Sequence, residues 1–155
     1  MRVLFDNTFG PPMTEWLAKT VQQWHKGPPV QLLHKRARFP GDTPDDIWIP
    51  QLEGEDWIVV SSDMSRHGHP KLNQVCRDCK KSLFEFSGAL SSAGTFEWIR
   101  ALMHLWPIML VTADGCRNEW HHVAYGDSHR RTFKNEIKPW PTGILRKSAG
   151  RKKKS

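Results

Sequence analysis

The chain has 155 residues, of which 38% are hydrophobic and 25% are charged. This balance is typical of a globular protein and excludes a generally disordered chain, while the length favours one domain over two. The longest apolar-rich run, residues 105–111, is far shorter than the roughly 18–20 residues that a membrane-spanning helix needs. Asp6 interrupts the apolar start of the chain, so no signal peptide is expected. Three cysteines do not make a disulfide framework, and we therefore expect a cytoplasmic protein.

The net charge of +7 is concentrated at the C-terminus. Residues 146–155, RKSAGRKKKS, contain six basic residues and no acidic one, which leaves about +1 for residues 1–145. We therefore divide the chain into a domain over residues 1–145 and a basic, disordered tail over residues 146–155. The tail either attracts the phosphates of RNA or DNA or is simply solvated.

The first third of the chain predicts a strand, a helix and a second strand. Residues 2–6, RVLFD, are expected to form a short buried strand that ends in an acid. A helix follows from Pro11 and ends at Gly27, and residues 30–34 are the second strand. The apolar residues that recur at helical spacing in this helix, and that we expect to be buried, are Met13, Trp16, Leu17, Val21 and Trp24.

A second helix is predicted from Thr43 to about Gly54. Thr43 is suited to cap it, Pro44 suits the first helical position, and the following acids favour the positive end of the helix dipole. Residues 57–62, WIVVSS, are an apolar run typical of a buried parallel strand, and Asp63 comes directly after it.

The remaining segments continue the alternation of helices and strands. A helix is expected over residues 70–81 and a short strand over 83–86. A further helix is expected to break or restart at Pro107, with residues 108–112 helical rather than extended. The apolar stripe predicted for this last helix consists of Phe96, Ile99, Met103 and Trp106. One or two edge strands are expected between residues 119 and 137.

This alternation predicts an α/β domain with a mainly parallel sheet. Right-handed crossovers would put the second and third strands on either side of the first. Ligands bind such sheets outside the carboxyl ends of the strands, where the strand order switches. Asp6 and Asp63 lie at these ends, which makes this edge of the sheet the candidate site.

Three carboxylates are expected at this edge. Asp45, at the start of the second helix, is expected to join Asp6 and Asp63, and Asp46 is the alternative to Asp45. Carboxylates that converge repel one another unless a cation lies between them, and oxygen ligands of this kind suit Mg²⁺ or Mn²⁺. The alternative interpretation is that each acid simply closes a strand or caps a helix.

Three segments in succession carry a resemblance to a known family. The strand VLFDN, the segment GDTPDDIWIPQL and the segment EDWIVVSSDMSR resemble the PIN-like (PilT N-terminus) nuclease domains over residues 2–66, and most closely the compact subgroup related to VapC-type toxins. The resemblance implies an α/β/α sandwich. It also implies metal ligation and catalysis by Asp6, Asp45 and Asp63. Larger PIN nucleases have a fourth acid, for which the sequence offers no clear counterpart.

The resemblance further implies a metal-dependent endoribonuclease that hydrolyses RNA with metal-activated water. Asn7 is expected to support the site by hydrogen bonding, and Arg66 is expected to contact RNA phosphate. Such domains are often toxins paired with a small antitoxin protein, so an antitoxin and a second copy of the chain are the expected protein partners. No membrane is expected among the partners.

Two other interpretations remain open. The first is a catalytically inactive PIN-like domain that binds nucleic acid or protein. The second is a zinc-stabilised binding module, because four residues suited to bind zinc lie within thirteen residues, namely His67, His69, Cys76 and Cys79. In the competing interpretation the two cysteines only pack within a helix.

Overall fold

The structure is a computed structural model that describes residues 1–54, 56–62, 70–86, 94–115, 120–124 and 136–139. Its centre is a six-stranded sheet with the strand order β2-β1-β3-β4-β5-β6. Strands β1 to β5 run parallel, and β6 pairs with β5 in the antiparallel direction. The strands are β1 (Arg2–Phe5), β2 (Gln31–His34), β3 (Trp57–Ser62), β4 (Ser82–Phe86), β5 (Trp120–Ala124) and β6 (Glu136–Pro139). The predicted positions of the second and third strands beside the first, and of further strands at the edge, are confirmed.

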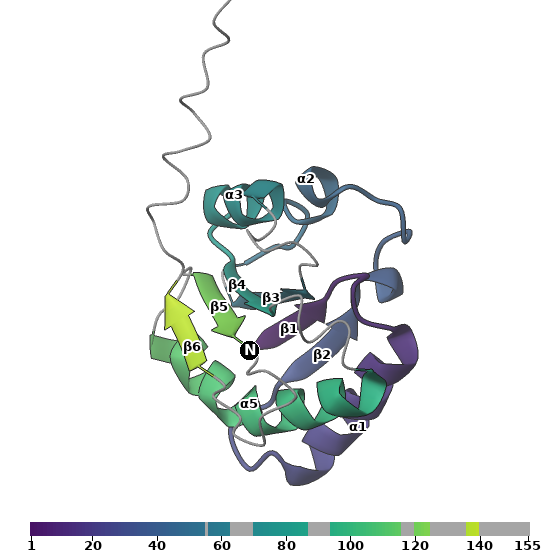
Figure 1. The fold of residues 1–155 in the computed structure, drawn as a ribbon. Helices are drawn as coiled ribbons and strands as arrows, with labels where there is room; N and C mark the ends of the chain where they lie inside the picture. The colour runs from purple at the N-terminus through teal and green to yellow at the C-terminus, as the bar shows by residue number, and fades with distance from the viewer. Residues whose placement is uncertain (55, 63–69, 87–93, 116–119, 125–135, 140–155) are drawn as a thin grey trace, which may run out of the picture.

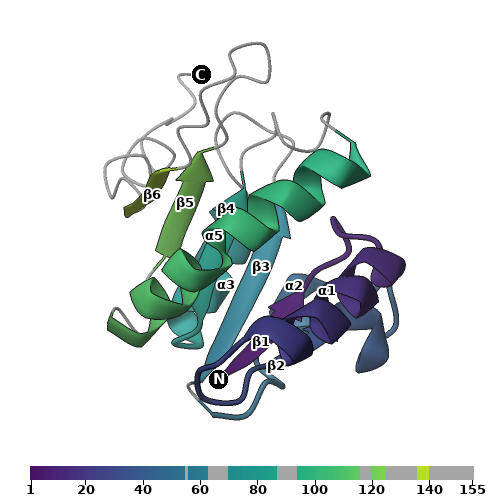
Figure 2. The ribbon, with the colours of Figure 1, turned by 90° about the horizontal axis from the view of Figure 1, so that it is seen from below.

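Helices cover both faces of the sheet and make a three-layer α/β/α sandwich. Helices α1 (Pro11–Trp24) and α5 (Thr95–Gly115) lie on one face, as Figure 2 shows, and α2 (Asp45–Trp48) and α3 (Pro70–Asp78) lie on the other, seen above the sheet in Figure 1. Alternate side chains of each strand feed the two cores. Phe5, Val60 and Phe84 pack toward α1 and α5, whereas Leu4, Val59 and Leu83 pack toward α2 and α3.

Helix α1 buries a narrower stripe than its apolar pattern predicts. The buried residues are Thr14, Leu17 and Val21, whereas the side chains of Trp16 and Trp24 are 45% and 74% exposed. A helix can press only one stripe onto a flat sheet, and Trp16 lies beside that stripe rather than on it. The prediction that both tryptophans are buried is therefore wrong.

Helix α2 is a single turn and not the longer helix predicted to reach Gly54. Pro44 occupies the N-cap position, and no side chain there caps the helix, so Thr43 does not have the predicted capping role. Pro50 has no N–H to continue the helical hydrogen bonds, and Gly54 adopts a positive φ of 86°. The chain therefore leaves the helix through turns between residues 49 and 54.

Helix α3 ends at Asp78, three residues before its predicted end, and Lys80 follows with a positive φ of 52°. Helix α5 continues through Pro107, so the break expected there is wrong, whereas the helical prediction for residues 108–112 is confirmed. Pro107 cannot bond to the carbonyl of Met103, but both residues are exposed and water can reach that carbonyl.

The buried stripe of α5 differs from the one predicted. Phe96 is 78% exposed and Met103 is 36% exposed. The side chains that pack on the sheet belong to Trp98, Ala101, Leu102, Trp106 and Met109. Among the helices that the structure describes, none is long and apolar enough to cross a membrane.

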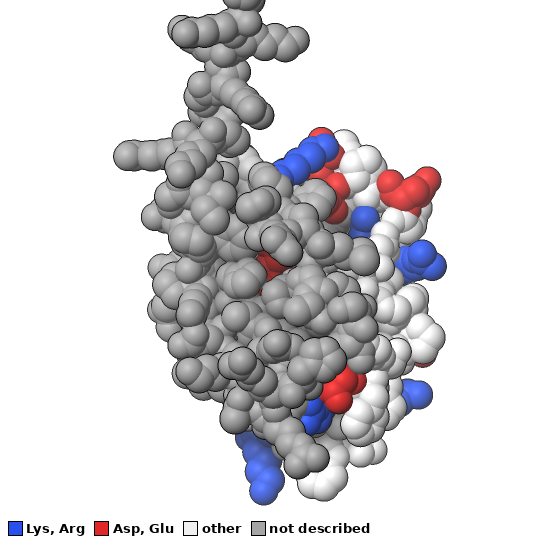
Figure 3. All heavy atoms as spheres, in the orientation of Figure 1, with Lys and Arg blue, Asp and Glu red and all other residues white. Residues whose placement is uncertain are grey.

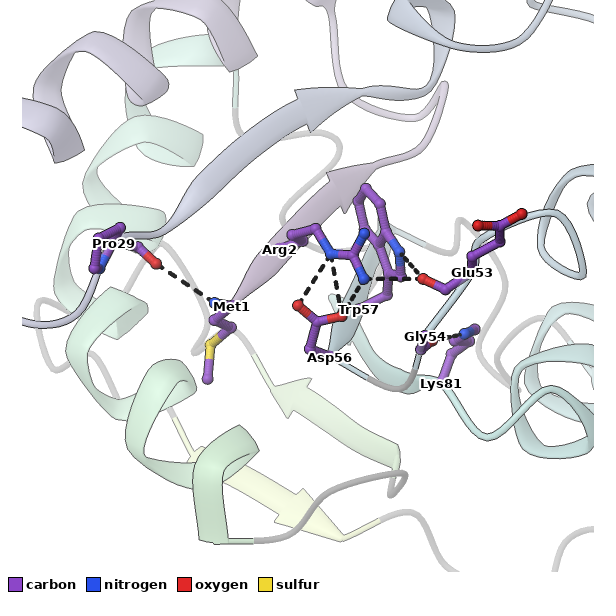
Figure 4. A network of polar contacts seen from close by, with 8 residues as sticks. All are labelled: Met1, Arg2, Pro29, Glu53, Gly54, Asp56, Trp57 and Lys81. Carbon is purple, nitrogen blue, oxygen red and sulfur yellow. Dashed lines mark hydrogen bonds and ion pairs between the residues drawn. The ribbon is translucent and has the colours of Figure 1, made fainter.

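A polar network holds the amino end of the sheet together (Figure 4). The Arg2 guanidinium forms an ion pair with Asp56, donates to the carbonyl of Glu53 at 2.9 Å and lies 4.5 Å from the centre of the Trp57 ring. The Trp57 indole N–H donates to the same carbonyl at 3.0 Å, and buried Lys81 donates to the carbonyl of Gly54. The network therefore fixes the loop that leads from α2 into β3.

Candidate functional site

The candidate site lies at the carboxyl edge of the sheet, at the opposite ends of the strands from that network. Asp6 follows β1 directly, and its N–H still donates to the carbonyl of Val60 at 3.0 Å, so the strand pairing extends to this residue. Its side chain is 9% exposed. Because it lies two residues after Leu4, it points to the face covered by α2 and α3.

Hydrogen bonds fix both carboxylate oxygens of Asp6. Oδ1 accepts from the backbone N–H of Thr8 at 2.8 Å and from the Thr8 hydroxyl, and Oδ2 accepts from the Ser61 hydroxyl. The Thr8 hydroxyl in turn accepts from the backbone N–H of Ser62 at 2.9 Å. The carboxylate is thereby held in one orientation between the ends of β1 and β3.

The electrostatic environment of Asp6 opposes its negative charge. Burial raises the pKa of the Asp6 carboxyl above its usual value, and the hydrogen bonds from Ser61 and Thr8 oppose this effect. The negative charge of Asp45 raises this pKa further. Asp6 and Asp45 are therefore close enough to repel each other, although they come from separate elements.

Asp45 is the first residue of α2, and a core tryptophan positions it. The indole N–H of Trp48, which is fully buried, donates to Oδ1 of Asp45 at 2.8 Å. Buried Lys35 lies 5.4 Å from the centre of the Trp48 ring and donates to the carbonyl of Thr43 at 2.6 Å, which holds the start of α2 against the core.

Asp46 and Asn7 have different surroundings from the two coupled acids. Asp46 is exposed and forms an ion pair with Lys71 of α3 at 3.1 Å, so of the two neighbouring acids it is Asp45 that lies beside Asp6. Asn7 donates its side-chain N–H to the carbonyl of Gly41. It thus connects the loop after β1 to the loop that leads into α2.

Glu85 is a third acid at this edge, and the sequence analysis did not identify it. It lies in β4, is 1% exposed and pairs in register with Ser61, whose hydroxyl donates to Asp6. Residues in register on parallel strands share a face, so Asp6, Ser61 and Glu85 form one row across β1, β3 and β4. The available signal was an acid between two phenylalanines in the short run SLFEF, at the end of a predicted strand.

The thiol of Cys76 lies in the electrostatic field of the same three acids. Burial raises its pKa well above the usual value, and the charges of Asp45, Glu85 and Asp6 raise it further, as does Cys79. Cys76 is fully buried in the core beneath α2 and α3. This burial agrees with the packing interpretation of Cys76, whereas the zinc interpretation also needs His67 and His69, which lie outside the described residues.

Other predicted residues fall outside the part of the chain that the structure describes. These are Asp63, Arg66, His67, His69 and the basic tail over residues 146–155. Within the described ranges, no three histidine, cysteine or acidic side chains lie close enough to hold a metal ion between them. In the view of Figure 3, the described acidic and basic side chains are interspersed over the surface, in keeping with the small net charge of residues 1–145.

Comparison with known families gives a match to the model of the PIN-like domain over residues 1–88. The chain belongs to the PIN-like domain family. The match spans β1 to β4 and includes Asp6, Asp45 and Glu85, so it extends beyond the resemblance over residues 2–66. It does not distinguish the VapC-type subgroup, which stays a prediction. Neither the curated proteins nor the solved structures gave a match.

PIN-like domains are generally nucleases, and they typically use divalent metal ions. The chemistry of this PIN-like domain's carboxyl edge fits such an ion. Asp6 and Asp45 are carboxylates that repel each other, and carboxylate oxygens are the ligands that Mg²⁺ and Mn²⁺ prefer. A divalent cation would neutralise the repulsion between Asp6 and Asp45.

Proposed function

We propose that this PIN-like domain is an endoribonuclease that hydrolyses phosphodiester bonds of RNA with the help of Mg²⁺ or Mn²⁺. The observation that carries the proposal is the set of acids at the carboxyl edge of the sheet. Asp6 and Asp45 are each held by hydrogen bonds and interact electrostatically, and buried Glu85 lies in the same row as Asp6. Membership of a family of nucleases supports it.

A bound divalent cation would activate water as the nucleophile and offset the charge that develops on the phosphate. Asp6 and Asp45 would hold this cation, with Asp63 as the third ligand expected from the sequence. Thr8 and Ser61 keep the Asp6 carboxylate in one orientation, and Trp48 does the same for Asp45. Such fixed orientation lowers the cost of assembling the site before RNA binds.

The RNA-binding and biological parts of the proposal rest on the sequence. Arg66 and the basic tail would contact phosphates, and the tail would do so without regard to base sequence. The resemblance to VapC-type domains supports the further proposal that the protein is a toxin neutralised by a small antitoxin.

The direct test is cleavage of structured RNAs with Mg²⁺ or Mn²⁺ by the wild type and three variants. We expect Asp6→Asn and Asp45→Asn to reduce the rate by about 100-fold or more, because each removes a charged ligand from the cation. Asp46→Asn is the matched control, and its rate should stay near that of the wild type because Asp46 is exposed and paired with Lys71. Thermal unfolding of each variant checks that it is folded. Full activity of folded Asp6→Asn would contradict the proposal.

The second candidate function is a catalytically inactive PIN-like domain that binds RNA or protein. The hydrogen bonds to Asp6 favour it, since both oxygens already accept bonds from protein groups. This alternative predicts no cleavage by the wild type and RNA binding that Asp6→Asn leaves unchanged. A zinc-stabilised form would need the Cys76 thiolate, which burial disfavours, and metal analysis of the purified protein tests it.

A further inference from the structure

Asn73 carries a buried oxygen that no hydrogen bond satisfies. The residue lies in α3 and is 1% exposed, and within the described residues its Oδ1 has no hydrogen-bond partner. A buried acceptor without a donor costs about 1–3 kcal/mol, so such atoms are few in folded proteins. An unsatisfied oxygen of this kind calls for a ligand.

The direction of α3 places Asn73 nearer than Cys76 to the carboxyl edge of the sheet. The helix begins after the carboxyl end of β3 and ends shortly before the amino end of β4, so it runs from the carboxyl edge of the sheet to the amino edge. Asn73 and Cys76 are three residues apart and therefore share one face of the helix. Cys76 already lies within reach of the charges of Asp45, Glu85 and Asp6. Asn73 is one turn closer to the edge at which these acids lie.

We propose that Oδ1 of Asn73 is a ligand of the divalent cation bound by this site, an inference that rests on the proposed function. The carboxylates already repel one another, and a neutral amide oxygen adds a hard ligand without adding negative charge. The cation would supply the partner that Asn73 lacks and would offset the cost of burying its oxygen.

The alternative role for Asn73 is that of a hydrogen-bond donor to a carboxylate. If the Asn73 amide turned its N–H toward a carboxylate, it would act as a donor that stabilises the acid in the absence of any cation. The two roles separate when Asn73 is replaced by aspartate, which keeps the shape and offers only oxygens. They separate again when it is replaced by leucine, which has a similar volume and no polar atom.

The experiment measures Mn²⁺ binding by the free-Mn²⁺ electron paramagnetic resonance signal, together with thermal unfolding with and without MnCl₂. We expect Asn73→Leu to weaken Mn²⁺ binding at least about tenfold and to leave the metal-free protein as stable as the wild type or more so. Asn73→Asp should bind Mn²⁺ as tightly as the wild type or more tightly, and should be stabilised more by Mn²⁺. Gln23→Glu, on the exposed surface of α1, controls for added charge and should change neither measurement by much.

The outcomes distinguish this inference from the proposed function. Unchanged Mn²⁺ binding by Asn73→Leu, beside a wild type that binds Mn²⁺, would overturn the inference and leave the proposed function intact. Weakened binding by folded Asn73→Asp would overturn it in favour of the donor role. A wild type that does not bind Mn²⁺ would overturn both. If Asn73→Leu does not fold, Asn73→Asp alone decides between ligand and donor.

Discussion

The Thr8 hydroxyl donates a hydrogen bond to the Asp6 carboxylate, and the Thr8 backbone N–H donates a second to the same oxygen at 2.8 Å. The hydroxyl also accepts from the N–H of Ser62, so Thr8 joins the acid to β3 as well as to β1. Thr8 therefore controls the orientation of Asp6 without being an acid itself.

Replacing Thr8 with valine should reduce RNA cleavage by about tenfold or more, because the variant keeps the shape of the side chain and loses the hydroxyl that orients Asp6. The free energy of unfolding should fall by about 1–3 kcal/mol, because the Ser62 N–H loses its acceptor and the Asp6 carboxylate loses a donor. Thr8→Ser keeps the hydroxyl and should retain most of the activity. Equal loss in the serine and valine variants would show that the methyl group matters rather than the hydrogen bond.

Glu85 should contribute to cation binding although it is a buried residue at the end of the row. Glu85→Gln removes one negative charge near Asp6 and Asp45, and we expect the dissociation constant for Mn²⁺ to rise about tenfold, which corresponds to about 1.4 kcal/mol. The metal-free protein should not lose stability through this charge change, because a charge is costly to bury. Calorimetric titration with MnCl₂ measures the affinity. Glu15→Gln, on the exposed surface of α1, is the control and should bind Mn²⁺ like the wild type.

Gly54 is required at the amino edge by its backbone and by its neighbours. Its φ is 86°, and a Cβ there would lie 2.8 Å from Nη2 of Arg2. We expect Gly54→Ala to lower the free energy of unfolding by about 1–3 kcal/mol, the cost of holding a side-chain residue in this conformation. Chemical denaturation measures the change. Gly10→Ala is the control, since Gly10 has a φ of −72° and space for a Cβ, and its effect should stay within about 0.5 kcal/mol.

Cys76 should resist alkylation under conditions that modify Cys79. Burial and the neighbouring charges raise the pKa of the Cys76 thiol, so the reactive thiolate stays scarce as the pH rises through the range of ordinary thiols. The folded state disfavours this thiolate, so the protonated Cys76 thiol stabilises the fold fully at pH values below the usual thiol pKa. This contribution to the free energy of unfolding is lost as the pH rises through the raised pKa of Cys76. Mass spectrometry of iodoacetamide-treated native protein at pH 8 and 9 identifies the modified cysteine. Faster modification of Cys76 than of half-buried Cys79 would refute its assigned environment.

The sheet was predictable because its strands carry strong local signals. The run from Trp57 to Ser62 is continuously apolar or small and is bounded by polar residues, and its predicted limits match β3. The crossover rule then places β2 and β3 beside β1 without any information on distant contacts. The position of Asp6 at a strand end follows from the same local pattern.

The buried faces of the helices and the role of the third acid, Glu85, could not be predicted, because they depend on tertiary contacts that the spacing of apolar residues does not reveal. Trp24 fits an apolar stripe by spacing, but it is the last residue of α1 and is 74% exposed. Glu85 could not be assigned to the site from the sequence, because only its register with Ser61 shows that it lies in the same row as Asp6. Likewise, the sequence contains Asn73 but does not indicate that its oxygen is buried without a donor.

One end of the sheet holds the network that stabilises the fold, and the other end holds the acids of the candidate site. This separation is useful for protein engineering. The Arg2–Asp56 network and Gly54 lie at one end of strands that have 4 to 6 residues, and the acids lie at the other. At about 3.3 Å per residue the ends are about 13–20 Å apart. The effects of substitutions separated by more than about 10 Å usually add. Stabilising substitutions at the amino end should therefore combine independently with any change at the acids. They would provide a robust background in which even strongly destabilised variants of the acidic edge can be purified and compared.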